Sequence, residues 1–391
     1  ELLTIEQQAY HSEGTCTFYG TANTNQLIAE AMGFQLPGAA FTPTDSPIRN
    51  CLNNESLRSL IRMMDAEMGL GEMLDVKNWV NAIIVLLASG GSTNLVIHLI
   101  AMARSAGYII TIEDFNDLSS MIPLLCRIYP NGNADVNEFH SEGGIARLLK
   151  NLIDGELIYE DIHTVAGLGL SHYTKVPTIG ASQSSELQWE ELAMHSQPLK
   201  SITTAHKPYK PNGGIKFIGG DIAEGLIKVS ALKNENEIIS APVRVFLTQD
   251  EVLNAYAHDE LNQDMILVLL GQSPSINGMP ELHKLTSPIN VLQTRGYKIA
   301  LITDGRMSGA SGSFPALIHA VSENNNLYKI RTGDILTLDL KECILTIDSN
   351  EYQKRAAIEI TPSNIGLGRE LFKVFRDNVS SVKLGATIFH E

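Results

Sequence analysis

The chain has 391 residues, of which 44% are hydrophobic and 19% charged, and its formal net charge at pH 7 is −15. These values are ordinary for a globular protein, and the length predicts two domains or one large domain. The acidic balance excludes nucleic acid and anionic membrane as the main partner, because both need clustered lysine and arginine. No apolar run reaches the ~18 residues of a membrane span, so no membrane partner is expected.

Cysteine usage indicates the compartment. Cys16, Cys51, Cys126 and Cys343 stand far apart and form no CxxC pair, which excludes a zinc knuckle and a thioredoxin-type motif. So few cysteines in so long a chain are typical of a reducing cytoplasm. The first residue is Glu and no signal peptide is visible, as expected of a mature N-terminus or of a truncated chain.

Helical periodicity dominates the first half. Apolar residues recur at helical spacing in 21–33, 55–74 and 144–154, and in 78–108 on both sides of a Ser-Gly-Gly-Ser-Thr-Asn break. Between about 170 and 215 the chain becomes polar and is punctuated by prolines, which indicates a linker or a long crossing loop.

Strand-like runs dominate the second half, where Thr248 and Glu251 form a capping box for a short helix. The expected strands lie in 213–220, 225–232, 241–248, 264–271, 296–303, 334–340 and 343–348. We therefore expect an α/β protein with a helix-rich α/β N-terminal domain over 1–185 and a β-rich C-terminal domain over 186–391.

The segment GTCTFYGTANTN places Cys16 between two threonines, just ahead of an expected helix. Its small neighbours leave the sulfur uncrowded, and the helix dipole favours the thiolate, the form that binds metals or attacks carbon. A buried structural cysteine is the alternative, and the residues alone leave both interpretations open. The other three cysteines stand in apolar or strand contexts that are typical of structural residues.

The segment 298–323, KIALITDGRMSGASGSFPALIHAVSE, predicts an apolar strand, a polar loop and then an apolar helix. Loops at the carboxyl end of a strand gather ligands in α/β proteins, and glycines let a substrate approach the backbone. Asp304 offers a carboxylate, Arg306 a fork of donors, and Ser308 and Ser311 offer hydroxyls. An ordinary glycine-rich turn is the alternative, but the crowding of polar groups favours a functional loop.

Two shorter stretches have simpler interpretations. Glu281 follows a Gly-Met-Pro turn, where it can bind a divalent metal or simply favour the N-terminus of an expected helix. Ser89–Asn94 can likewise be only a helix cap. The eleven histidines show no metal-binding spacing, and most of them are expected at the surface.

Taken together, six motifs resemble the dihydroxyacid/6-phosphogluconate dehydratase family, in that family's order and over nearly the whole chain. They are GTCTFYGTANTNQLIAEAMGFQLPG, ASGGSTNLVIHLIAMARSAG, YPNGNADVNEF, DIHTVAGLGL, NGMPELHKL and TDGRMSGASG. Thr-Cys-Thr-Phe-Tyr-Gly is closest to the 6-phosphogluconate branch, because branched-chain dihydroxyacid dehydratases more often carry Ser-Cys-Gly-Gly-Met-Tyr.

The resemblance implies a cytoplasmic, homodimeric hydro-lyase that removes water from 6-phospho-D-gluconate. The product would be 2-keto-3-deoxy-6-phosphogluconate of the Entner–Doudoroff pathway. It implies an iron–sulfur cluster, [4Fe–4S] in preference to [2Fe–2S], with Cys16 as one ligand, and Mg²⁺ bound by Glu281. Ser308 matches the serine proposed in the family as the base, while Asp304 and Arg306 are candidate substrate residues.

The family also implies a barrel-like, swivelling C-terminal domain and a site between the two domains, to which both Cys16 and Ser308 contribute. Its other cluster cysteines and the remaining Mg²⁺ ligands come from a more N-terminal region. We therefore expect this chain to lack about the first third of the protein.

Departures from the family pattern leave the substrate more open than the reaction. Glu224 in GGDIAEG stands where Gly-Asn-Leu-Gly-Arg is expected, so it can remove a positive charge near the site. Another sugar acid or a branched-chain dihydroxy acid is the alternative substrate. A cysteine-nucleophile enzyme would need a histidine beside Cys16, with His11 and His98 as candidates. A catalytically incomplete fragment is the third possibility.

Overall fold

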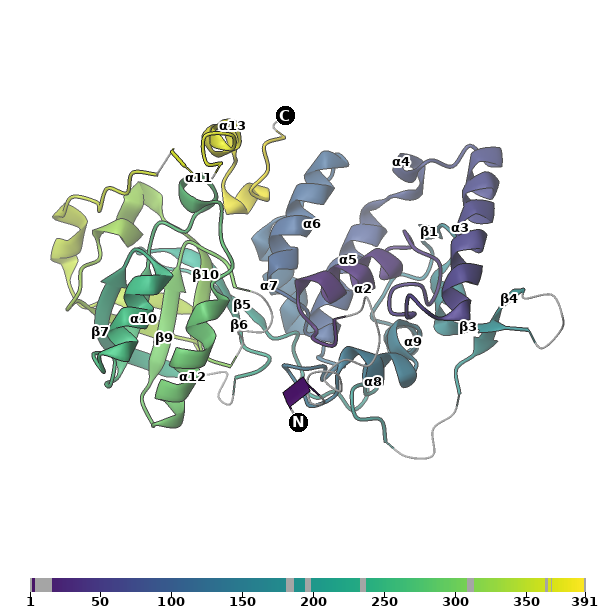
Figure 1. The fold of residues 1–391 in the computed structure, drawn as a ribbon, viewed down its shortest axis with the longest axis horizontal. Helices are drawn as coiled ribbons and strands as arrows, with labels where there is room; N and C mark the ends of the chain where they lie inside the picture. The colour runs from purple at the N-terminus through teal and green to yellow at the C-terminus, as the bar shows by residue number, and fades with distance from the viewer. Residues whose placement is uncertain are drawn as a thin grey trace. The chain divides into compact units, whose positions relative to one another are not determined.

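The computed structural model divides into two compact units, drawn in Figure 1. The first unit comprises Glu1–Leu95 and Asp117–Gly213, and the second comprises Val96–Asn116 and Gly214–Glu391. The described residues are 2–3, 16–180, 186–193, 198–232, 237–307, 313–362, 365–366 and 368–389. Within these ranges, no helix combines the length and the apolar character needed to cross a membrane.

Helices build the first unit, as the periodicity predicts. They are α2 (Thr21–Ala31), α3 (Pro47–Asp65), α4 (Leu70–Met73), α5 (Val76–Ser89), α8 (Val136–Ser141) and α9 (Gly144–Asp154). Their ends follow from local chemistry: Ser46 accepts a hydrogen bond from the backbone of Ile48 ahead of a proline at the first helical position, and Asp75 closes a capping box. Nearly all of α5 is buried, and α2 packs against both α5 and α9, so α5 is the central helix of this unit.

Two helices lead from one unit to the other: α6 (Asn94–Ser105) and α7 (Ile112–Met121). The predicted break between α5 and α6 is confirmed, because Gly90 ends α5 in the left-handed region at φ 66°. The predicted linker region contains more order than its composition indicates. It holds the turn η1 (Leu170–Thr174) and an antiparallel hairpin of β3 (Lys175–Ile179) and β4 (Leu187–Glu191), and it follows the short pair β1 (His163–Thr164) and β2 (Gly167–Leu168).

An eight-stranded sheet forms the second unit, in the order β12-β11-β7-β8-β9-β10-β6-β5. Its strands are β5 (Ile215–Ile218), β6 (Glu224–Lys228), β7 (Ile238–Phe246), β8 (Met265–Leu269), β9 (Ile299–Thr303), β10 (Ala316–Val321), β11 (Ile335–Asp339) and β12 (Ile344–Ile347). Strands β7 to β10 run parallel, and the outer strands pair antiparallel. A bridge between Gly219 and Ile344 links the two edges, so the sheet is nearly closed and the predicted barrel-like form is confirmed.

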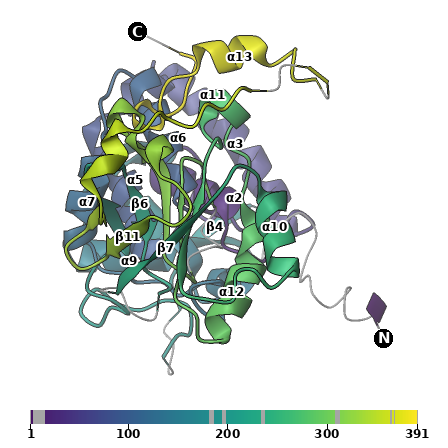
Figure 2. The ribbon, with the colours of Figure 1, turned by 90° about the vertical axis from the view of Figure 1, so that its left-hand side faces the viewer.

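Each face of this sheet buries its own core. One core gathers side chains from β5 to β12, among them Ile227, Ile266 and Leu338, and fills the inside of the curved sheet. The other core joins the sheet to the helices α10 (Gln249–Ala257) and α12 (Thr286–Thr294), which Figures 1 and 2 show on one face. Because β8 and β9 are buried on both faces, their sequences are continuous apolar runs, as expected of parallel strands.

All seven expected strand regions contain strands, and Thr248 caps α10 as predicted. The helix expected after the glycine-rich loop is wrong, because residues Ala316–Val321 form strand β10. A run of five apolar residues and one histidine suits a buried strand and a buried helix equally well. Here the backbone pairs with β9 on one side and with β6 on the other, and these long-range partners decide the conformation.

Candidate functional site

The turn that carries Cys16 is fixed to the start of α2 by one side chain. The amide of Asn23 donates to the carbonyl oxygens of Cys16 and Phe18, at 2.6 and 2.8 Å. The Cys16 side chain stays exposed, and Gly20 is the N-cap of the helix. An exposed thiol beside a helix N-terminus can reach a metal, so the residue fits the ligand role that the family implies.

The Ser89–Asn94 segment packs on the first turn of α2 and is therefore more than a helix cap. The hydroxyls of Thr21 and Ser92 lie 2.9 Å apart, Asn94 donates to Thr21 at 3.0 Å, and the Ser92 amide donates to the Thr24 hydroxyl. A Cβ atom at Gly91 would lie 2.5 Å from the Thr24 side chain, which explains the glycine.

The segment that begins with Tyr129 closes the same turn from the other side. The Tyr19 amide donates to the Tyr129 carbonyl at 2.9 Å, and the Val136 amide donates to the Thr17 carbonyl at 3.0 Å. The buried Tyr19 hydroxyl donates to Ser89 at 2.8 Å. Three motifs that are far apart in sequence therefore meet around the Cys16 turn, within the first unit.

The other cysteines have different surroundings. Cys126 is buried, and burial raises the pKa of its thiol well above the ordinary range. Burial also raises the pKa of the half-buried Cys343 thiol, and Cys51 is half-buried on α3. Their structural interpretation thus agrees with their burial. Within the described part of the chain, no three His, Cys, Asp or Glu side chains are grouped as a metal site.

In the second unit, Glu281 and Arg306 meet at the carboxyl ends of β8 and β9. Arg306 donates from Nη1 to Glu281 Oε2 at 2.7 Å and from Nε to the Met279 carbonyl at 2.6 Å. Both side chains are partly exposed, at 32% for Arg306 and 26% for Glu281, and their backbones form a parallel bridge. This edge of a parallel sheet is where α/β proteins bind ligands.

Asp304 joins two loops of this edge. One of its oxygens accepts from the Gln272 amide at 2.9 Å, and the other accepts from the Ser273 amide at 3.1 Å and from the Tyr328 hydroxyl at 2.6 Å. Burial raises the pKa of Asp304, and burial together with the charge of Asp304 raises the pKa of Tyr328. The carboxylate therefore holds the loops that follow β8 and β9, and its predicted contact with substrate stays a prediction.

The predicted site residues fall in different parts of the chain. Cys16 belongs to the first unit, whereas Glu281, Asp304 and Arg306 belong to the second. Ser308 and the neighbouring Ser311 lie outside the described residues, as does His11. The roles given to these residues stay predictions.

His319 was not predicted as a site residue, because most histidines were expected at the surface. It lies on β10 with only 1% of its surface exposed. Its backbone amide donates to the Gly305 carbonyl at 2.9 Å, next to Arg306. The signal in the sequence was a histidine within the apolar run Ala316–Val321.

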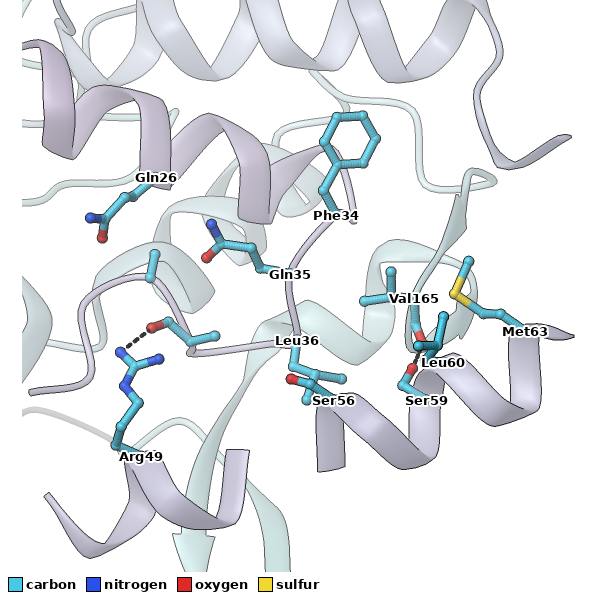
Figure 3. A pocket seen from close by; sticks show the side chains of 12 residues that line it. Gln26, Phe34, Gln35, Leu36, Arg49, Ser56, Ser59, Leu60, Met63 and Val165 are labelled. Atoms are coloured by element: carbon cyan, nitrogen blue, oxygen red, sulfur yellow. Dashed lines mark hydrogen bonds between the residues drawn. The ribbon is translucent and has the colours of Figure 1, made fainter. Parts of the chain in front are cut away.

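The first unit contains a cavity of about 560 Å³, shown in Figure 3. Gln26, Gln35 and Arg49 contribute polar groups to its lining, and Phe34 and Leu60 contribute apolar ones. Arg49 donates to the carbonyl of Ala39 at 2.7 Å. Of the predicted site residues that the structure describes, Cys16, Glu281, Asp304 and Arg306, none lines this cavity.

Comparison with known proteins agrees with these motifs. The profile described as Dihydroxy-acid/6-phosphogluconate dehydratase N-terminal matches residues 1–173, and the corresponding C-terminal profile matches residues 200–386. The chain belongs to the dihydroxy-acid/6-phosphogluconate dehydratase family.

The relatives indicate one branch of this family. The chain is 44% identical, over 99% of its length, to the phosphogluconate dehydratase of Escherichia coli K12, and 43% identical, over its whole length, to that of Pseudomonas aeruginosa. It is 32% identical, over 99% of its length, to the dihydroxy-acid dehydratase of Sulfurisphaera tokodaii. The chain spans 65% of the length of the first two relatives and 67% of the third.

Proposed function

We propose that the protein to which this chain belongs dehydrates 6-phospho-D-gluconate to 2-keto-3-deoxy-6-phosphogluconate. One observation carries this proposal: relatives named phosphogluconate dehydratase are 41–44% identical over essentially the whole chain, whereas the dihydroxy-acid dehydratase is 32% identical. Two further features support this proposal: the motifs occur in the order found in the family, and polar loops follow the carboxyl ends of β8 and β9.

The reaction sets the requirements for the site. The proton at C2 lies next to a carboxylate and is very weakly acidic, and the C3 hydroxyl is a poor leaving group. A positive charge beside the substrate carboxylate stabilises the negative charge that develops when the C2 proton is removed. Arg306 supplies such a charge: Nε and Nη1 are used within the protein, while Nη2 makes no hydrogen bond to any described residue and can bind an anionic group of the substrate.

Two cofactors belong to the proposal. We infer that Cys16 is one ligand of an iron–sulfur cluster, [4Fe–4S] in preference to [2Fe–2S], because its thiol is the exposed one of the four. We infer that Glu281 contributes an oxygen ligand to Mg²⁺, which carboxylates suit. Bound together, these metals would supply Lewis acid chemistry at the carboxylate and at the C3 hydroxyl. The other ligands would come from the part of the protein outside this chain.

Ser308 is the proposed base. A serine acts as a base only if its pKa falls far below that of a free alcohol, which a nearby cation achieves. Arg306 stands two residues earlier in the chain and carries a permanent positive charge at the strand end. The loop composition thus supports the role of Ser308, and its glycines allow the substrate close to the backbone.

The charge of Glu224, which departs from the family pattern, is compensated in the structure. Glu224 forms an ion pair with Lys383. This pairing supports keeping 6-phospho-D-gluconate as the proposed substrate, because the carboxylate is not left as an isolated negative charge. We further propose that the protein is a homodimer in the cytoplasm, as the family and the few cysteines indicate.

The test is a dehydration assay on the complete protein, purified without oxygen. It compares formation of a 2-keto acid from 6-phospho-D-gluconate, D-gluconate and 2,3-dihydroxyisovalerate. We expect 6-phospho-D-gluconate to have the highest kcat/KM. A higher kcat/KM for 2,3-dihydroxyisovalerate would move the protein to the other branch of the family, and no product from any of the three would contradict the proposed activity.

A further inference from the structure

A buried histidine lies beside the Arg306 loop. Both ring nitrogens of His319 are buried, and neither has a hydrogen-bond partner among the described residues. An unpaired buried polar atom lowers stability, because it has lost its bond to water without replacement. A leucine would fill the same place in the apolar strand β10 without that loss. Packing among the described residues therefore does not explain a histidine at this position.

The backbone of His319 also departs from regular structure. Its φ is 56°, in the left-handed region, and it lies in the β-bulge between Ile318 and Val321. The bulge turns its amide away from β6 towards the Gly305 carbonyl, which follows β9. Strained positions of this kind persist where the surrounding structure fixes them, and they gather at functional sites.

Electrostatics fix the charge of the ring. Burial, then the positive charge of Arg306 and the neighbouring His98, lower the pKa of His319 to about 3, so the imidazole is neutral at physiological pH. Other contacts also place Arg306 near His98. Arg306 donates to the carbonyl of Met279, and Met279 packs against Ile97, the residue before His98. A neutral imidazole has one donor nitrogen and one acceptor nitrogen. A hydroxyl group also both donates and accepts, so the two groups can hydrogen-bond in either direction.

We propose that His319 is a substrate-binding residue that hydrogen-bonds a hydroxyl group of a polyhydroxy acid whose anionic group binds Arg306. The inference rests on the proposed function for the class of substrate. The position of His319 beside the loop after β9 does not depend on the proposed function. The carboxylate or phosphate has only acceptor atoms and suits Arg306, whereas a hydroxyl suits the ring of His319.

The first test needs no ligand and uses the complete protein with His319→Leu and His319→Gln. Neither ring nitrogen has a hydrogen-bond partner among the described residues, so leucine removes no bond seen there. The leucine variant should therefore unfold at a higher temperature than the wild type, or at one no more than about 5 °C lower. A larger loss of thermal stability in both variants would show that the ring is paired within the protein and would overturn the inference. This measurement tests the inference on His319 even if no sugar acid binds to the protein.

The second test measures affinity by calorimetry for 6-phospho-D-gluconate and its single-deoxy analogues. The wild type should bind one deoxy analogue at least about tenfold more weakly than the parent compound, because the ring then loses its partner. That difference should vanish in His319→Leu and persist in part in His319→Gln. If the variants lost affinity equally for every compound, as expected for a merely structural residue, the inference would be overturned. It would also be overturned if they lost no affinity at all.

The two proposals fail in different measurements. The proposed function fails in the wild-type protein, if no 2-keto acid forms from 6-phospho-D-gluconate. The inference on His319 fails only in the comparison of the variants with the wild type, in thermal stability or in the pattern of affinities.

Discussion

Glu281 and Arg306 are joined twice, by an ion pair of 2.7 Å between their side chains and by a bridge between their backbones. The candidate metal ligand and the candidate substrate residue therefore hold one another in place at the edge of the parallel strands. A change in either side chain is expected to affect the other, so their effects should not be additive.

Glu281→Gln tests the carboxylate as a metal ligand. A neutral amide is a weaker ligand for Mg²⁺, so the concentration needed for half-maximal activity should rise by about tenfold or more. A Mg²⁺ titration of the dehydration rate measures it, with Glu260→Gln, at an exposed ion pair with Arg244, as the control. An unaltered Mg²⁺ dependence would remove Glu281 from the metal site.

Arg306→Lys tests the guanidinium. Lysine keeps the charge but cannot donate in a fixed fork to Met279 and Glu281 while also binding a substrate anion. We expect KM for 6-phospho-D-gluconate to rise by about tenfold, with a smaller change in kcat. Arg295→Lys, at an exposed arginine, should leave both constants unchanged. Wild-type kinetics in Arg306→Lys would argue for a structural ion pair alone.

Cys16→Ser tests the cluster. Serine replaces a soft thiolate ligand, so the protein purified without oxygen should lose visible absorption, iron and activity together. The matched control is Cys343→Ser, at a half-buried cysteine far from any ligand motif, which should remain brown. A colourless Cys16→Ser protein with full activity would end the assignment.

Ser308→Ala tests the base. The cluster should remain, since no proposed ligand is changed, and kcat should fall by about 10²–10⁴. Absorption spectra and single-turnover rates separate the two effects. Ser313→Ala is the control, because Ser313 is exposed and donates to Asn290. Unchanged turnover in Ser308→Ala would show that another group removes the proton.

Glu30 gives a prediction about stability and pH. Its fully buried carboxyl accepts bonds from the Gly38 and Ala40 amides, and burial raises its pKa from 4.5 to about 7. The folded state therefore binds the proton more tightly than the unfolded state. Its contribution to stability is complete below pH 4.5 and is lost as pH rises through 7, by roughly 3 kcal/mol in total.

Urea denaturation between pH 4.5 and 7 measures this slope. In Glu30→Gln the decline of the free energy of unfolding with pH should flatten, whereas in Glu160→Gln, an exposed control, it should persist. The same slope in Glu30→Gln and in the wild type would mean that Glu30 is ionised in the folded protein throughout this range.

Local patterns were enough for most elements. The helices α2, α5, α6 and α9 and the seven predicted strands follow from apolar periodicity and from capping residues, which act over a few positions. For β10 the sequence predicted a helix, because its five apolar residues carry no distinguishing period, and only its pairing with β9 and β6 fixes it as a strand.

The sequence by itself determined the family, through motifs such as that around Cys16, and the residue types available for chemistry. Only the tertiary structure decided which groups meet: Asp304 with Tyr328, Glu281 with Arg306, and His319 with the loop after β9. The reason is physical, because burial, pairing and the pKa shifts that follow depend on neighbours distant in the chain. Periodicity and composition carry no record of those neighbours.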